Sequence, residues 1–312
     1  MSELIFALEL VVPIVLIISL GYLLKKLKLI NDNFLAVGNK LVFKVFLPVL
    51  LFYNTYNSDL SEDINFWFFI YVMLVILTLL FIGVIIFSKL VKEKTKIGPL
   101  VQFMFRINYS VVGYPIILGL TADSNSAVIA MATIIIVSLN NIFSVIVLSY
   151  YGDGKCDVKS VIKNIVTNPL IIALVLGFLA ASIELQIPII VLKSLNNIKI
   201  MASPFALIIL GGGFSFRSAK NNMPIINIAL ILKFLVLPAI GLTISILLGF
   251  RDVQLAILLV IFCAPTAVSS FVMAQGFKND GELAGQLVVF STLATGFSLV
   301  IFISILKMMS YL

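Results

Sequence analysis

Histidine is absent from this sequence, cysteine occurs only twice, and charged residues make up 11% of its 312 positions. The absence of histidine removes the most common metal ligand and the usual proton relay at neutral pH. Cys156 falls in a predicted cytoplasmic loop and Cys263 in a predicted membrane segment, so we expect no disulfide between them. An ordinary soluble domain is about a quarter charged, and the low charged fraction therefore excludes that class of protein.

Apolar residues, in contrast, are abundant: 62% of the residues are hydrophobic and the mean hydropathy is +1.20. A helix needs about 20 mainly apolar residues to cross a bilayer. The sequence predicts ten such spans, at residues 5–24, 34–54, 64–90, 100–121, 126–150, 160–182, 187–213, 222–249, 252–275 and 281–306. The first span follows no basic stretch and precedes no small-residue cleavage site, so we predict a spanning helix rather than a removable signal peptide.

The charges of the connecting loops alternate along the chain. Lysine or arginine follows the odd-numbered spans, at Lys25, Lys26, Lys28, Lys89, Lys92, Lys94, Lys96, Lys155, Lys159, Arg217, Lys220 and Lys278. The opposite loops carry acids, at Glu3, Asp59, Glu62, Asp63, Asp123 and Glu184, with Arg251 and Lys307 as exceptions. Because cytoplasmic loops are enriched in basic residues, both termini are predicted to be extracellular. The net charge of +7 is interpreted as this topology signal, and no nucleic-acid partner is predicted.

The positions of proline indicate an internal repeat. Three prolines have counterparts 150–156 residues later: Pro13 with Pro169, Pro48 with Pro204, and Pro115 with Pro265. Because each half holds an odd number of spans, the two halves enter the membrane from opposite sides, as in inverted-topology repeats. We therefore predict an all-α polytopic membrane protein built from two inverted five-helix repeats, residues 1–150 and 151–312.

Two spans at matching places of the halves carry helix-breaking residues in their middle. In span four, 100–121, Pro115 cannot donate a backbone hydrogen bond and Gly113 eases unwinding. Pro265 interrupts span nine, 252–275, in the same way. We predict that new half-helices begin after these prolines and cross near the midplane, where their free N–H groups favour an anion. The alternative is a simple proline kink in each helix.

Polar side chains near these breaks and charged side chains inside spans are the candidate substrate ligands. Asn108 can hydrogen-bond to a substrate or only to a neighbouring helix. Lys44, Lys199 and Lys233 lie near span centres, where a charge is costly and marks a functional candidate. Lys44 and Lys199 could instead pair with backbone carbonyls at helix breaks. Three basic residues nearer the span ends are expected to snorkel to an interface: Lys40, Lys193 and Arg106. The predicted substrate-binding residues are Asn108, Gly113, Tyr114, Pro115, Ala264, Pro265, Thr266, Ser269, Lys44 and Lys199.

Acidic residues are missing from the middle of every predicted span. A coupling Na⁺ would therefore be held only by carbonyls, amides or hydroxyls, and coupling stays open between symport and uniport. The sequence contains no nucleophile–base constellation, metal-ligand cluster or nucleotide motif. The run Gly211-Gly212-Gly213 lacks the Lys-Ser/Thr pair of a phosphate-binding loop. We therefore predict neither an enzyme nor a cofactor.

Four motifs follow one another along the chain. They are Arg106-x-Asn108 with Gly113-x-Pro115, Lys163-Asn164 with Asn168-Pro169, Ala202-Ser203-Pro204-Phe205-Ala206-Leu207 with Leu210-Gly211-Gly212, and Ala264-Pro265-Thr266-Ala267 with Ser269 to Ala274. Together they resemble the auxin efflux carrier family, which includes plant PIN-type carriers and bacterial malate or malonate permease-like proteins. The resemblance implies a fold similar to bile-acid-symporter-like transporters. Spans 1, 2, 6 and 7 would be the scaffold, and spans 3–5 and 8–10 a transport domain with an elevator-like movement.

The resemblance also implies a homodimer and a secondary transporter of the cell membrane with a small organic anion as substrate. The long hydrophilic loop of many plant members is absent, so a small carboxylate such as malate or malonate is expected rather than auxin. Two alternatives stay open. A Na⁺-coupled bile-acid-type symporter would depend on a Na⁺ gradient. A non-transporting sensor or intramembrane enzyme would need a soluble domain or deep catalytic residues, which the sequence lacks.

Overall fold

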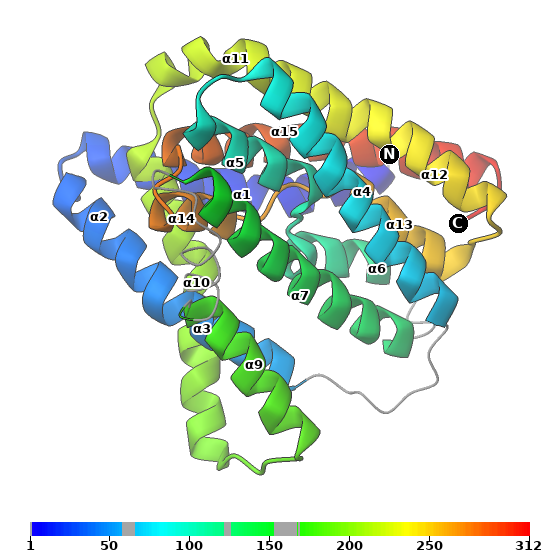
Figure 1. Ribbon diagram of the computed structural model, residues 1–312, viewed down its shortest axis with the longest axis horizontal. Coiled ribbons are helices and arrows are strands. Elements are labelled where there is room, and N and C mark those ends of the chain that lie inside the picture. Colours follow the sequence, from blue (N-terminus) through cyan, green and yellow to red (C-terminus); the bar gives the residue numbers. More distant parts are fainter. Residues whose placement is uncertain (1, 58–65, 122–125, 153–166, 168) are drawn as a thin grey trace.

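The computed structural model describes residues 2–57, 66–121, 126–152, 167 and 169–312 (Figure 1). Within these ranges the chain forms helices and no strand. The helices fall into two groups, one built around α10 and one around α5 and α13. The helix α1 touches both groups, because it packs along α10 on one side and along α15 on the other.

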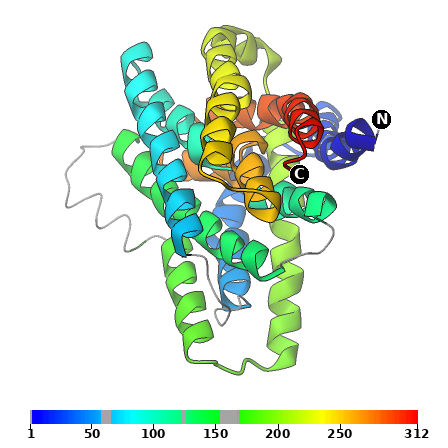
Figure 2. The ribbon, with the colours of Figure 1, turned by 90° about the vertical axis from the view of Figure 1, so that its right-hand side faces the viewer.

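The first group contains helices from both halves of the chain. Its members are α1 (Ser2–Lys26), α2 (Asp32–Leu41), η1 (Val42–Phe46), α3 (Leu47–Tyr56), α9 (Pro169–Ser182) and α10 (Ile189–Gly213). A Cβ on Gly211 of α10 would lie 1.9 Å from the carbonyl oxygen of Ile18 in α1, so these two helices are in backbone contact. Small residues permit such close approach in membranes. In Figure 2, α9 and the start of α10 extend below the rest of the molecule.

The second group surrounds two short, buried helices. Its members are α4 (Phe66–Leu90), α5 (Lys94–Phe105), η2 (Tyr109–Gly113), α6 (Tyr114–Thr121), α7 (Ser126–Tyr151), α11 (Phe216–Ile231), η3 (Leu232–Val236), α12 (Leu237–Leu247), α13 (Asp252–Cys263), α14 (Ser269–Gly276) and α15 (Gly281–Met308). The helix α5 packs against α4, α7 and α15, and α13 packs against α6 and α12. Every residue from Leu255 to Cys263 is buried, so α13 is a core helix of this group.

Three prolines share one local structure. The π-helical turns η1, η2 and η3 each end two residues before a proline, at Pro48, Pro115 and Pro238. A proline has no N–H and its ring crowds the carbonyl four residues earlier. A π-helical turn has a wider hydrogen-bond register, which lets the chain continue as helix past that obstacle. These prolines are therefore accommodated within helices and do not split them.

The surface matches a lipid environment. Six continuous helical segments of the described chain are long and apolar enough to span a membrane, at residues 32–56, 66–90, 131–151, 189–213, 216–247 and 281–308. Large apolar side chains point outward on several of them, including Trp67, Leu247 and Phe297, each more than 75% exposed. Such exposure is costly in water and favourable in lipid. The chain is a multi-pass helical membrane protein.

The predicted fold class is thus confirmed at this coarser level. The ten-span inverted arrangement stays a prediction, because by length and composition six segments qualify as spans. Some predicted features fall outside the described residues: the start of span six, Cys156, the motif Lys163-Asn164 with Asn168, and the acidic loop residues Asp59, Glu62, Asp63 and Asp123.

Candidate functional site

Two helical segments of the second group are interrupted. The helix α5 ends at Phe105, residues 106–108 are non-helical, and helical structure resumes at Tyr109. The helix α13 ends at Cys263, and α14 begins at Ser269. We call residues 106–108 the first break and residues 264–268 the second break. Both interruptions were predicted from the sequence, and at this level the prediction is confirmed.

The position of the first break differs from the prediction. The half-helix was expected to begin after Pro115, but the helix is already open at Arg106 and has resumed before that proline. The reason is that η2 absorbs the missing hydrogen bond of Pro115, as the other two π-helical turns do for their prolines. The predicted start of the first half-helix was therefore wrong by several residues.

The two breaks are bonded to each other. The backbone N–H of Asn108 donates to the carbonyl of Pro265 at 2.8 Å, and the hydroxyl of Thr266 donates to the carbonyl of Arg106 at 2.9 Å. The N–H of Thr266 donates in turn to the hydroxyl of Ser291 on α15, at 3.2 Å. Non-helical backbone at membrane depth is tolerated only where protein or a wet cavity supplies such partners. The crossing of the two breaks is thus a fixed structural unit.

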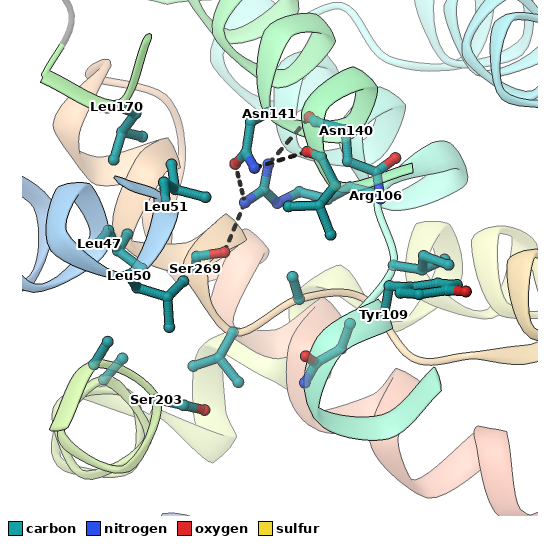
Figure 3. Close-up of a pocket in the computed structure, with 17 residues that line it drawn as sticks. Leu47, Leu50, Leu51, Arg106, Tyr109, Asn140, Asn141, Leu170, Ser203 and Ser269 are labelled. Carbon is teal, nitrogen blue, oxygen red and sulfur yellow. Dashed lines mark hydrogen bonds between the residues drawn. The ribbon is translucent and has the colours of Figure 1, made fainter. Parts of the chain in front are cut away.

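Arg106 lies in the first break, and its guanidinium is buried, with 4% of the residue exposed. Its Nη1 donates to the carbonyl of Asn140 at 3.1 Å and to the hydroxyl of Ser144 at 2.9 Å. Its Nη2 donates to the Asn141 side-chain oxygen at 2.9 Å and to the Ser269 hydroxyl at 2.7 Å (Figure 3). All these acceptors are neutral, and no carboxylate of the described chain pairs with this cation.

The expectation that Arg106 snorkels to an interface is therefore wrong. The polar face of α7 supplies enough acceptors to hold the guanidinium inside the protein, so it does not need to reach the membrane surface. The Nε of the same side chain has no hydrogen-bond partner, and neither does the side-chain oxygen of Asn140. Buried polar atoms are rarely left unpaired, so this region has unused hydrogen-bonding capacity.

A cavity of about 90 Å³ lies beside Arg106 (Figure 3). One wall comes from the breaks and from α7, and the other comes from α3, α9 and α10 of the first group. The cavity is lined by Leu47, Leu50, Leu51, Arg106, Ile107, Asn108, Tyr109, Val137, Asn140, Asn141, Leu170, Ala202, Ser203, Ala206, Ala267, Val268 and Ser269. The first residues of η2 and α14, Tyr109 and Ser269, both belong to this lining, so the two resuming helices start at the cavity.

The predicted site residues lie in three places. Asn108 and Ser269 line the cavity. Ala264, Pro265 and Thr266 are buried in the crossing itself. The remaining five lie outside the lining: Gly113 is buried against Val260, Tyr114 is 38% exposed, Pro115 is half-buried in α6, Lys44 is exposed on η1, and Lys199 is half-buried with its Nζ 4.3 Å from the ring centre of Tyr53.

Five lining residues with polar side-chain groups were not predicted as ligands: Arg106, Tyr109, Asn140, Asn141 and Ser203. For two of them the sequence held a signal, because Asn140 and Asn141 are adjacent amides in the middle of an apolar span. Such residues usually face the inside of a bundle. Arg106 could also have been a candidate ligand, because it is a charged residue inside a predicted span. Its short distance from the predicted span end instead favoured the interpretation that it snorkels to the membrane interface.

Interrupted helices that cross beside a small cavity, inside a multi-pass bundle, are the architecture of secondary-transporter binding sites. The fold and the site therefore define a membrane transporter. The sequence matches the family described as membrane transport protein over residues 6–152 and 157–303, and the chain belongs to this family, that of the auxin efflux carriers. It is accordingly a transporter and not an enzyme.

Two archaeal relatives are similar along almost their whole length. An uncharacterized transporter of Methanocaldococcus jannaschii is 24% identical over 294 residues, covering 91% of this chain and 94% of the relative. An uncharacterized transporter of Methanothermobacter thermautotrophicus is 24% identical over 301 residues, covering 93% and 95%.

Proposed function

We propose that the protein carries a small organic anion, a carboxylate such as malate or malonate, across the cell membrane. The observation that supports this most is Arg106, a buried cation at the wall of a cavity with only neutral partners among the described residues. A buried charge without a counter-charge is expensive, and an anionic substrate would supply that counter-charge. The Nε–H of Arg106, which has no partner in the described structure, is the guanidinium donor left free for a carboxylate oxygen.

The helices that begin after the two breaks, η2 and α14, also favour a negatively charged substrate. Because η2 and α14 begin at Tyr109 and Ser269, and both residues line the cavity, the N-terminal ends of these two helices lie at the cavity. The N–H groups of Ser270 and Phe271 already donate to the carbonyls of Ala267 and Val268. Helix N-termini carry partial positive charge and bind anions through unpaired N–H groups. The cavity is also much smaller than the roughly 300–1,000 Å³ of sites for drug-sized ligands, which favours a substrate of few atoms.

We propose further that the first helix group is a scaffold and that the second moves against it in an elevator-like way. The position of the cavity between the two groups supports this, since relative movement would change its access. In the same proposal the chain makes ten spans as two inverted five-helix repeats, residues 1–150 and 151–312, with both termini extracellular. A homodimer completes the proposal.

Uptake of radiolabelled malate and malonate into proteoliposomes tests the proposed function. The wild-type protein is expected to take up at least one small carboxylate, and Arg106→Gln is expected to lower that uptake by at least about tenfold, since a charge-assisted hydrogen bond contributes roughly 1.5–3 kcal/mol. Arg217→Gln is the matched control, because Arg217 is an exposed arginine that does not line the cavity. Failure of every small carboxylate to move or to compete would contradict the proposal.

A further inference from the structure

A second buried cation lies at the first break, outside the cavity lining. Lys233 belongs to η3, and only 1% of the residue is exposed. Its Nζ donates to the carbonyl of Phe103 at 2.5 Å and lies 3.4 Å from the carbonyl of Arg106. No acidic side chain of the described ranges forms an ion pair with it. Lys233 does not line the cavity, so the proposed substrate site does not explain why this buried lysine is there.

The place that the Lys233 ammonium occupies is a carbonyl-lined helix end. The last four carbonyls of a helix have no partner within that helix, and together they carry partial negative charge. Here α5 ends at Phe105, so the carbonyl of Phe103 belongs to that last turn. The carbonyl of Arg106 follows it and also accepts the hydroxyl of Thr266 from the second break. In transporters with broken helices, such helix ends and unwound carbonyls coordinate Na⁺.

The surroundings of the Lys233 Nζ are suited to a cation. Besides the two carbonyl oxygens, the ring centres of Phe103 and Phe234 lie 4.6 and 5.9 Å from it. The faces of aromatic rings attract cations. An ammonium has three donors and no acceptor, and these neighbours offer it only acceptors and ring faces.

We infer that Lys233 is a tethered cation that fills, at the first break, the position which a coupling Na⁺ takes in cation-driven carriers. This inference rests on the proposed function only where it concerns the ion dependence of anion uptake. Anion uptake then needs neither Na⁺ nor K⁺, because the carbonyl site is permanently occupied from within the chain. Replacing Lys233 with an apolar residue vacates the site and makes it available to an alkali cation.

The experiment compares the purified wild-type protein with Lys233→Met in detergent. Unfolding temperatures are measured in NaCl, KCl and choline chloride at equal ionic strength. The wild-type protein is expected to unfold at the same temperature in all three salts. Lys233→Met is expected to unfold at a lower temperature in choline and to regain about 2–4 °C in NaCl or KCl, because a bound cation stabilises the folded state. Lys44→Met is the matched control, since Lys44 is exposed on the corresponding π-helical turn η1.

Two results would overturn the inference. One is a wild-type unfolding temperature or carboxylate uptake that falls when choline replaces Na⁺ and K⁺. The other is a folded Lys233→Met protein whose stability is the same in every salt. If Lys233→Met fails to insert, Lys233→Ala takes its place, because alanine also leaves both carbonyls without a side-chain donor. The salt-dependent unfolding requires no substrate, so failure of the carboxylate proposal would be recognised separately, by absent uptake beside an intact cation response.

Discussion

Arg106 contributes both its side chain and its backbone carbonyl to the contacts around the first break. Its guanidinium faces the cavity and is held by α7 and α14, while its carbonyl accepts hydrogen bonds from Thr266 and Lys233. One residue therefore connects the proposed anion site with the tethered cation. Because buried polar networks are costly when one member is lost, changes here are expected to affect transport more than changes of single apolar lining residues.

Asn108 gives a prediction at the residue scale. The change Asn108→Ala removes the side chain from the cavity and keeps the backbone N–H that donates to Pro265. The loss of one hydrogen bond to the substrate is expected to lower the uptake efficiency by about two- to tenfold, equivalent to roughly 0.5–1.5 kcal/mol. Membrane insertion and the elution volume in size-exclusion chromatography should not change.

The control for Asn108→Ala is Asn57→Ala, an exposed residue at the end of α3 whose amide donates to the Tyr53 carbonyl. That variant should transport like the wild-type protein. Unchanged uptake kinetics in Asn108→Ala would remove Asn108 from the substrate site, even if carboxylate transport itself is found.

Among the elements, the π-helical turns explain why prolines and helix breaks do not coincide. In the first broken segment, η2 lets the helix continue into Pro115, and the break occurs where Lys233 and Thr266 offer partners to freed carbonyls. The sequence marked the segment as interrupted through its proline, its glycine and its polar residues. The position of the break depends on groups more than a hundred residues away, which local sequence cannot reveal.

The contact between α1 and α10 gives a prediction at the element scale. A Cβ on Gly211 would lie 1.9 Å from the Ile18 carbonyl oxygen, so Gly211→Ala must push the two helices apart. Such overpacking costs roughly 1–3 kcal/mol, and we expect a clearly lower unfolding temperature in detergent.

Gly213→Ala, only two positions later, is the matched control for Gly211→Ala. A Cβ on Gly213 meets nothing within 4 Å, so this variant should be as stable as the wild-type protein or slightly more stable, because alanine favours the helix. Equal unfolding temperatures for the two variants would show that α1 and α10 do not pack as closely as described.

For the whole molecule, the sequence predicted the class of protein and the family but not the composition of the cavity. Hydropathy and the four motifs identified a helical membrane transporter, since lipid imposes strong constraints on composition. The lining, however, joins Leu47, Ser203 and Arg106 from three distant segments. Which side of each helix faces inward is decided by packing between the two groups, so these residues could not be selected from spacing alone.

Binding of carboxylates to the purified protein, measured by isothermal titration, tests the central claim most directly. Each small carboxylate is compared with its neutral amide, for example malonate with malonamide, because the pair differs little in size and differs in charge. An anion site at Arg106 requires that the wild-type protein binds at least one carboxylate, that it does not bind the matching amide, and that Arg106→Gln abolishes this preference. Equal binding of acid and amide, or an acid preference that persists in Arg106→Gln, would contradict it.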